Sequence, residues 1–143
     1  MSKLLLISIK EKFVNKIICG EKTIELRKSK PKAQIGDTVV IYTTQPKKAI
    51  TALAIIKNII SHTPSDMWEK YGDRLGVSKE EFDNYYSLNT KAIGIELENV
   101  HKLNDEILLS AIKAIYPKFS PPQTFKYLNK FESLRKFHRK RSS

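Results

Sequence analysis

Several features that would narrow the chemistry of this 143-residue chain are scarce or missing. It has a single cysteine, Cys19, so no disulfide can form within the chain, which is typical of proteins in a reducing cytoplasm. No apolar run approaches the ~20 residues that cross a bilayer, and the run at residues 4–7 is far too short for a secretory signal. We therefore expect a cytoplasmic protein with no membrane partner.

Phosphate loops and metal-binding spacings are also missing. The five glycines are scattered, and none belongs to a GxGxxG motif or a P-loop. His62, His101 and His138 lie far apart without a cysteine partner, which is unlike the ligand spacing of a zinc site. No Ser-His-Asp arrangement stands out either. We expect neither a metal nor a cofactor.

Acidic residues are few relative to basic ones. Lys and Arg number 26 against 15 Asp and Glu, which gives a formal charge of +11 and an isoelectric point near 9.7. This excess favours a polyanionic partner, although solubility alone also explains it. The last residues are the most basic: 130–143 hold six Lys and Arg and one acidic residue, Glu132. We expect one domain over 1–129 and a basic C-terminal helix or tail over 130–143.

The most informative segment is residues 20–27. Apolar residues at helical spacing precede it, and Gly20 is placed to end that helix. After Gly20, polar and apolar residues alternate as in a strand, which puts Thr23, Glu25 and Arg27 on one face. Lys22 lies at the start of this strand, where its amine can reach the polar face. The alternative interpretation is a solvated Glu25–Arg27 pair on an ordinary strand.

The remaining pattern predicts short strands and helices in alternation. Strands are expected at 3–9, 22–27, 38–43, 49–60 and 92–99, and helices at 11–19, at 65–70, after a capping box at 78–81, and from Gln123 onward. Residues 107–115 fit either a short helix or an extended edge. Strands with short inserted helices favour a small α+β barrel over a doubly wound sheet.

The segment at 20–27 reads Gly-x-Lys-Thr-x-Glu-x-Arg, which resembles the signature of the ASCH (activating signal cointegrator homology) domain. Further segments are similar to that family in the same order, at 35–42, 67–86, 92–97 and 119–128, so the resemblance covers about residues 3–128. It implies a PUA-like small β-barrel of about five to six strands with inserted short helices.

The resemblance also implies a link to RNA. Some related proteins bind RNA, some are ribonucleases, and some small bacterial members remove the acetyl group from N4-acetylcytidine. In that amidohydrolase branch the catalytic lysine corresponds to Lys22, and a later glutamate corresponds by position to Glu80 or Glu81. Glu25 stands where that branch has a threonine nucleophile, and a carboxylate cannot replace a hydroxyl in that role. Lys22 and Glu25 remain the candidate catalytic pair, as general acid and base or as a charge clamp.

Basic loops flank this segment in the sequence. Lysines crowd residues 28–32 and 47–48, and if both loops rise at one end of the barrel they form a basic rim. The rings of Tyr42, Tyr85, Tyr86 and Trp68 are candidates for stacking on an unpaired base, with core packing as their alternative role, and Tyr42 is the best of them because its strand runs towards this rim. Thr124 matches a position where related sequences often carry serine, and N-capping a following helix is its alternative role. The predicted nucleic-acid contacts are Lys22, Thr23, Arg27, Lys28, Lys30, Tyr42, Lys47, Gln123 and Thr124.

Three classes of function follow from the sequence. The first is a protein that binds RNA, single-stranded or as a modified nucleoside, in a basic cleft around Lys22, Glu25 and Arg27. The second is an enzyme that acts on that ligand, a ribonuclease or an N4-acetylcytidine amidohydrolase. The third is a transcription-linked regulator that acts through a protein partner, which the sequence does not identify.

Overall fold

A single sheet of six strands organises the computed structural model, which describes residues 4–128. The strands are β1 (Leu4–Ile9), β2 (Ile24–Arg27), β3 (Thr38–Thr43), β4 (Ala49–His62), β5 (Ala92–Leu108) and β6 (Phe125–Leu128). Their order across the sheet is β2-β5-β4-β3-β1-β6, with β1 parallel to β3 and every other pair antiparallel.

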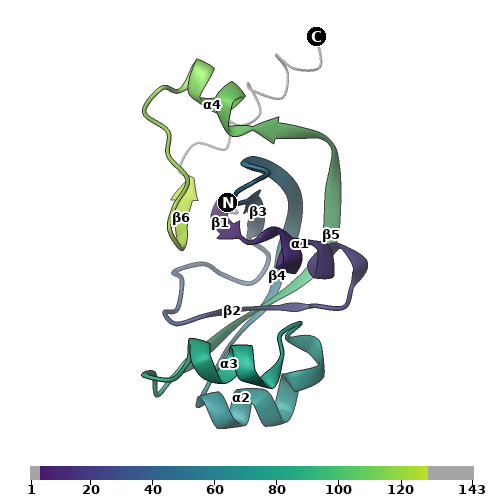
Figure 1. Ribbon diagram of the computed structural model, residues 1–143, viewed down its shortest axis with the longest axis vertical. Coiled ribbons are helices and arrows are strands. Elements are labelled where there is room, and N and C mark those ends of the chain that lie inside the picture. Colours follow the sequence, from purple (N-terminus) through teal and green to yellow (C-terminus); the bar gives the residue numbers. More distant parts are fainter. Residues whose placement is uncertain (1–3, 129–143) are drawn as a thin grey trace.

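The sheet curls into a half-barrel because its two long strands bend (Figure 1). β4 and β5 pair over most of their lengths, and their register shifts at three places. Such irregularities bend a strand and increase its twist, which brings the ends of the sheet towards each other. The expected α+β architecture with a PUA-like sheet and short helices is confirmed.

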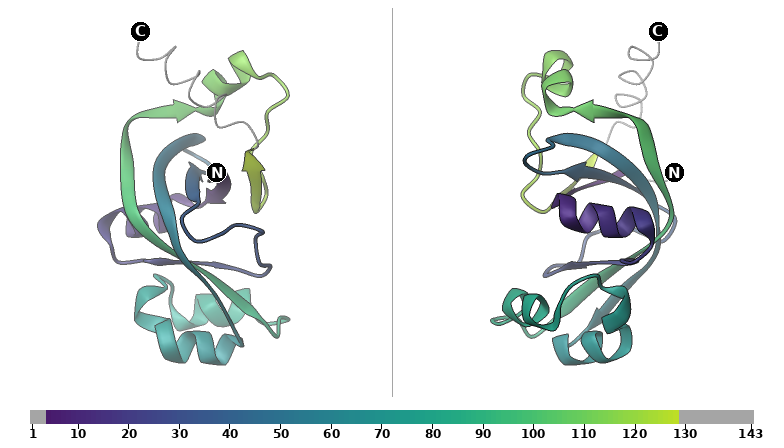
Figure 2. Two further views of the ribbon diagram at one scale, coloured as in Figure 1. Left: turned by 180° about the vertical axis from the view of Figure 1, so that it is seen from behind. Right: turned by 45° about the vertical axis from the view of Figure 1, so that its right-hand side comes forward.

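The helices lie in three places around this sheet, one near its middle and two at opposite ends (Figure 2). They are α1 (Glu11–Cys19), α2 (Pro64–Tyr71), the 3-10 helix η1 (Gly72–Arg74), α3 (Lys79–Tyr85) and α4 (Leu109–Ile115). α1 packs Val14 and Ile17 into the core of the sheet. α2 and α3 lie together beyond β2, over a separate apolar cluster that includes Met67 and Phe82. No helix in the described part of the chain is long and apolar enough to cross a membrane.

Local signals placed several helix ends correctly. α1 has the predicted bounds, and Gly20 ends it in the left-handed conformation with φ 87°. The capping box before α3 is present: the Ser78 hydroxyl accepts from the Glu81 amide, and the Glu81 carboxylate accepts from the Ser78 amide. Residues 107–115 divide between the end of β5 and α4, so both expected states occur there.

The prediction of a helix from Gln123 onward is wrong. Residues 125–128 form β6, which pairs antiparallel with β1. The backbone groups of β1 need partners on the side away from β3, and Phe125 and Tyr127 also pack against the core from this strand. The expected basic helix or tail at 130–143 lies outside the described residues.

Candidate functional site

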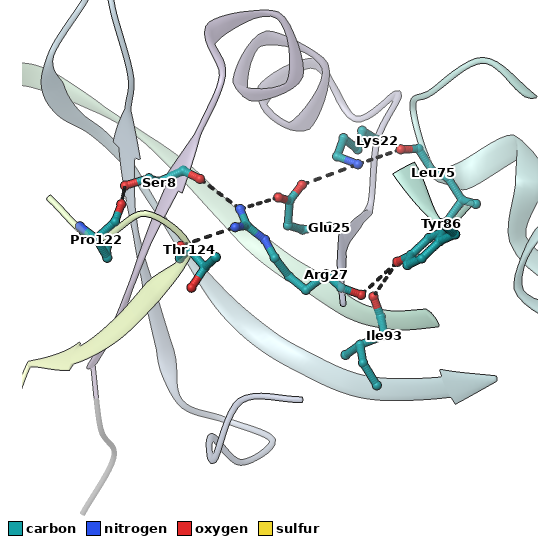
Figure 3. Close-up of polar contacts among 9 residues, drawn as sticks. All are labelled: Ser8, Lys22, Glu25, Arg27, Leu75, Tyr86, Ile93, Pro122 and Thr124. Atoms are coloured by element: carbon teal, nitrogen blue, oxygen red, sulfur yellow. Dashed lines mark hydrogen bonds and ion pairs between the residues drawn. The ribbon is translucent and has the colours of Figure 1, made fainter. Parts of the chain in front are cut away.

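The side chains of Lys22, Glu25 and Arg27, all from the 20–27 segment, lie side by side in a buried row (Figure 3). Glu25 lies between the two cations: its Oε1 is 3.5 Å from Lys22 Nζ and its Oε2 is 2.6 Å from Arg27 Nη2. The Lys22 side chain is only 2% exposed and that of Glu25 8% exposed. The alternative of a solvated Glu25–Arg27 pair is therefore wrong.

The backbone before β2 explains how Lys22 joins this row. Strand pairing begins at Ile24, two residues later than predicted, because the two preceding amides have other partners. The Lys22 amide donates to the Lys16 carbonyl (3.0 Å) and the Thr23 amide to the Arg74 carbonyl (3.0 Å). The turn after α1 thus directs the Lys22 side chain inward.

Arg27 links the two open ends of the half-barrel. It lies on the edge strand β2, yet Nη2 donates to the Ser8 carbonyl on β1 (2.9 Å) and Nη1 to the Thr124 carbonyl just before β6 (3.2 Å). The Ser8 hydroxyl donates to the Pro122 carbonyl (2.6 Å), which holds the chain before β6 against β1. Side-chain hydrogen bonds therefore bridge a gap that strand pairing leaves open.

Burial of the row changes the pKa of Lys22 and leaves one Arg27 donor without an acceptor among the described residues. Burial lowers the pKa of the Lys22 ammonium, because the charged form loses its hydration, and the neighbouring Glu25 carboxylate partly opposes this shift. Within residues 4–128, Arg27 Nε is a buried donor with no hydrogen-bond acceptor. The row therefore contains a lysine whose ammonium gives up its proton more readily than an exposed one, and an arginine Nε that no atom of the described residues accepts from.

A cleft of about 860 Å³ opens above this row. Its walls come from β1, α1, the start of the 28–32 loop, α3 and the chain before β6. Five of its lining side chains are basic and two are acidic: Lys10, Lys12, Lys22, Arg27 and Lys28 against Glu25 and Glu81. The rings of Phe13 and Tyr85 also line it, and the Lys28 ammonium lies 4.7 Å from the centre of the Tyr85 ring.

Glu81 forms an ion pair that connects two walls of the cleft, α1 and α3. Its carboxylate is 2.6 Å from Lys12 Nζ, so the pair joins α3 to α1. The hydrogen bond from Lys12, followed by the one from the Ser78 amide, lowers the pKa of Glu81 to about 2. Glu81 therefore carries its negative charge at any ordinary pH.

Only part of the predicted contact set reaches this cleft. Lys22, Arg27, Lys28 and Gln123 line it, and Thr124 contributes its carbonyl to Arg27; Glu25, the other member of the candidate catalytic pair, also lines the cleft. The following positions lie elsewhere: Lys30 is exposed in its loop outside the lining, the Thr23 hydroxyl accepts from Arg74 Nε (3.0 Å), and Lys47 pairs with Glu106 (3.1 Å).

Tyr42 does not fit the stacking role expected of it. Its ring is buried, 3% exposed, among the apolar side chains of the core, because β3 lies in the middle of the sheet. Tyr85, on α3, has an exposed fraction of 38% and lines the cleft. The aromatic surface available to a ligand therefore comes from the helical segment and from Phe13 on α1.

The sequence reasoning missed Ser8, Lys10 and Lys12 as cleft residues. Ser8 left one signal: it is the lone hydroxyl in the otherwise apolar strand Leu4–Ile9. The two lysines left none, because lysines are frequent throughout the chain. In the described part of the chain, no group of three or more His, Cys, Asp and Glu side chains is arranged to hold a metal ion.

The fold and the cleft place this protein among the PUA-like half-barrels, and comparison with known proteins narrows the class. The model of the family named Domain of unknown function (DUF365) matches residues 5–118. An ASCH domain-containing ribonuclease from Zymomonas mobilis is 29% identical over 127 residues, which are 89% of this chain and 85% of that protein.

Solved structures agree with this assignment. The crystal structure of ASCH from Zymomonas mobilis has a TM-score of 0.87 at 27% identity, and the match covers 95% of this chain and 94% of that one. Human THYN1, solved in complex with 5-methylcytosine containing DNA, shares the fold at a TM-score of 0.58 and 13% identity, over 96% of each chain. The chain belongs to the DUF365 family and is an ASCH-domain protein, which confirms the predicted resemblance.

Proposed function

We propose that this ASCH-domain protein binds single-stranded RNA, or a modified nucleoside from it, in the cleft above Lys22, Glu25 and Arg27. The observation that carries the proposal is the cleft itself, an open groove with five basic side chains over a buried charged row. The similarity to a protein named a ribonuclease supports RNA as the ligand.

Each part of the cleft has a role in this proposal. Lys10 and Lys28 neutralise phosphates, and Lys30 extends this contact along the loop. A base stacks on Tyr85, which requires the Lys28 ammonium to leave the ring face and move to a phosphate. The remaining lone pairs of the Glu25 carboxylate, which lines the cleft, then accept from polar atoms of the ligand.

A second candidate function, cleavage of the bound RNA, is favoured by the state of Lys22. Cleavage needs a base to take the proton of the attacking 2′-hydroxyl and an acid to return a proton to the leaving 5′-oxygen. The Glu25 carboxylate takes the proton of the 2′-hydroxyl, and the Lys22 ammonium, 3.5 Å away, gives a proton to the leaving 5′-oxygen, which its lowered pKa makes easier. Arg27 stays charged and stabilises the phosphorane between the two steps.

Removal of an acetyl group from N4-acetylcytidine has less support. A covalent route needs a hydroxyl nucleophile beside Lys22, and Glu25 occupies that position in ion pairs with both cations. Deacetylation of N4-acetylcytidine is measured in a separate assay, since a modified nucleoside is a candidate ligand.

The test is binding of labelled single-stranded RNA over a salt series, resolved on native and denaturing gels. We expect a shifted band that salt releases, and shortened RNA if the bound strand is cleaved. Lys28→Ala should reduce the slope of log affinity against log salt by about 0.7, the value for one phosphate contact on a single strand. The exposed Lys57, on β4 and outside the cleft, provides the control Lys57→Ala with an unchanged slope.

The stacking role has its own matched pair of variants. Tyr85→Ala should weaken RNA binding by about 1–3 kcal/mol, the range for loss of one stacked base. Tyr116→Ala is the control, because that ring is equally exposed at 37% against 38% but lies outside the cleft. The absence of any shift at low salt would refute the nucleic-acid proposal and leave a regulator that acts through a protein partner.

A further inference from the structure

Three consecutive backbone carbonyls accept hydrogen bonds from Lys22 and from two residues near it, Thr23 and Lys16. In the loop formed by residues 74–76, which we call the clamp loop, the Arg74 carbonyl accepts from the Thr23 amide (3.0 Å). The Leu75 carbonyl accepts from Lys22 Nζ (2.6 Å) and the Gly76 carbonyl from Lys16 Nζ (3.0 Å). Figure 3 shows the Leu75 carbonyl on the side of Lys22 opposite Glu25. Each carbonyl of the clamp loop thus holds a donor from the segment around Lys22.

The Gly76 backbone leaves no room for a side chain. A Cβ added there would lie 2.6 Å from Lys22 Cβ, 2.9 Å from its Cγ and 3.0 Å from its Cδ. Gly76 also has φ +64°, a conformation that other residues rarely adopt. The Lys22 side chain is buried, and the nearest clashing atom is its Cβ, which cannot move aside by a change of rotamer because it is bonded to the backbone. A residue other than glycine at this position therefore displaces Lys22.

The clamp loop is itself anchored on the helical segment. The Leu75 side chain is fully buried in the apolar cluster that contains Met67 of α2 and Phe82 of α3. Arg74 adds a second attachment, because its side chain pairs with Glu96 on β5 and donates to the Thr23 hydroxyl (3.0 Å). The loop is thus held from both sides and cannot drift away from Lys22 without local unpacking.

We propose that the clamp loop positions the Lys22 amine at the floor of the cleft, and that Gly76 is a positioning residue because only glycine permits this approach. Neither Gly76 nor the clamp loop touches the ligand. Their effect on RNA rests on the proposed function, whereas their effect on Lys22 itself does not. This division assigns the α2–α3 segment a specific task, to supply the carbonyls that orient the lysine.

Gly76→Ala and Gly36→Ala form a matched pair. Both glycines have positive φ, +64° and +94°, so alanine strains the backbone at either position. A Cβ at Gly36 meets nothing within 4 Å, whereas one at Gly76 meets Lys22. The difference between the two variants therefore reports the displacement of Lys22 alone.

The first measurement is reductive methylation of Lys22, quantified by mass spectrometry against the exposed Lys57 of the same molecule. In Gly76→Ala, labelling of Lys22 should rise about tenfold, as expected when a protected group becomes open to solvent. Gly36→Ala should label like the wild type. RNA affinity should fall about tenfold in Gly76→Ala only, in parallel with the labelling.

The outcomes separate the two proposals. If a folded Gly76→Ala protein is methylated at Lys22 to the same extent as the wild type, the positioning role is overturned. Increased labelling in a protein whose wild type does not bind RNA supports the positioning role and refutes the proposed function. If Gly76→Ala does not fold, Lys16→Met replaces it, because it removes the donor to the Gly76 carbonyl from outside the cleft. Faster hydrogen exchange at the Thr23 amide then supports the clamp, and unchanged exchange overturns it.

Discussion

Replacement of Glu25 by glutamine tests the charge balance of the buried row most directly. The carboxylate stands between two cations, 3.5 Å from Lys22 Nζ and 2.6 Å from Arg27 Nη2, and its side chain is 8% exposed. Glutamine keeps the size and one acceptor oxygen but removes the charge. Two buried cations then lose their counterion, which water cannot replace at this depth.

The expected cost follows from measurements on buried ion pairs. Removing one partner of such a pair destabilises a protein by about 3–5 kcal/mol. The lower end applies to Glu25→Gln, because the amide oxygen still accepts from Arg27 and Lys22 can lose its proton, so we expect about 3 kcal/mol. With an m-value of about 2 kcal/mol per M in urea, the unfolding midpoint should fall by about 1.5 M.

The assay is urea unfolding at pH 7, followed by the fluorescence of Trp68, the sole tryptophan of the chain. Asp83→Asn is the matched control, because the same change of carboxylate to amide breaks an exposed pair with Lys79, 56% exposed on both sides. Such a pair contributes about 0.3–0.5 kcal/mol. If Glu25→Gln costs no more than Asp83→Asn, the inferred role of Glu25 as the counterion of the row is refuted.

Three further predictions concern single contacts. Because the pKa of Lys22 is lowered in the folded state, the unfolded chain binds more protons than the folded one between that pKa and 10.5, so the free energy of unfolding should rise with pH in this range. Urea unfolding of Lys22→Met over the same pH range should show no such rise, and a rise equal to that of the wild type would contradict the prediction. Lys12→Met should raise the pKa of Glu81 from about 2 towards 4.5 in a carbon-13 titration, and an unchanged pKa would show that the cap alone sets it. Gly94→Ala should cost about 1–3 kcal/mol in urea unfolding, since its Cβ would lie 2.8 Å from Ile24 Cγ2, and wild-type stability would show that β2 moves freely.

Elements whose signals are local could be predicted from the sequence. The bounds of α1 and of β3 (Thr38–Thr43) match the expectation, as does the capping box at Ser78. In each case the deciding interaction lies within a few residues: a glycine that adopts positive φ, an alternation of apolar side chains, or a hydroxyl three residues from its amide. These signals do not depend on the rest of the fold.

Elements that depend on distant partners could not be predicted in this way. Residues 125–128 carry no strong local preference and become a strand because β1 offers an unpaired edge. From the sequence, Tyr42 and Tyr85 are both candidates for stacking on a base. Only the fold shows that the Tyr42 ring is buried in the core and that the Tyr85 ring lines the cleft. Burial, and hence availability to a ligand, is a property of packing rather than of sequence spacing.

The sequence alone determined the family resemblance and the placement of Lys22, Glu25 and Arg27 in one short segment, because motif order and strand periodicity are written along the chain. The tertiary structure decided what that segment becomes. Curling of β4 and β5 brings Arg27 to Ser8, 19 residues away in sequence, and the α2–α3 segment brings the Leu75 carbonyl to Lys22 across 53 residues. The lowered pKa of Lys22 arises because these contacts keep water away from its amine, and long-range packing is what excludes that water.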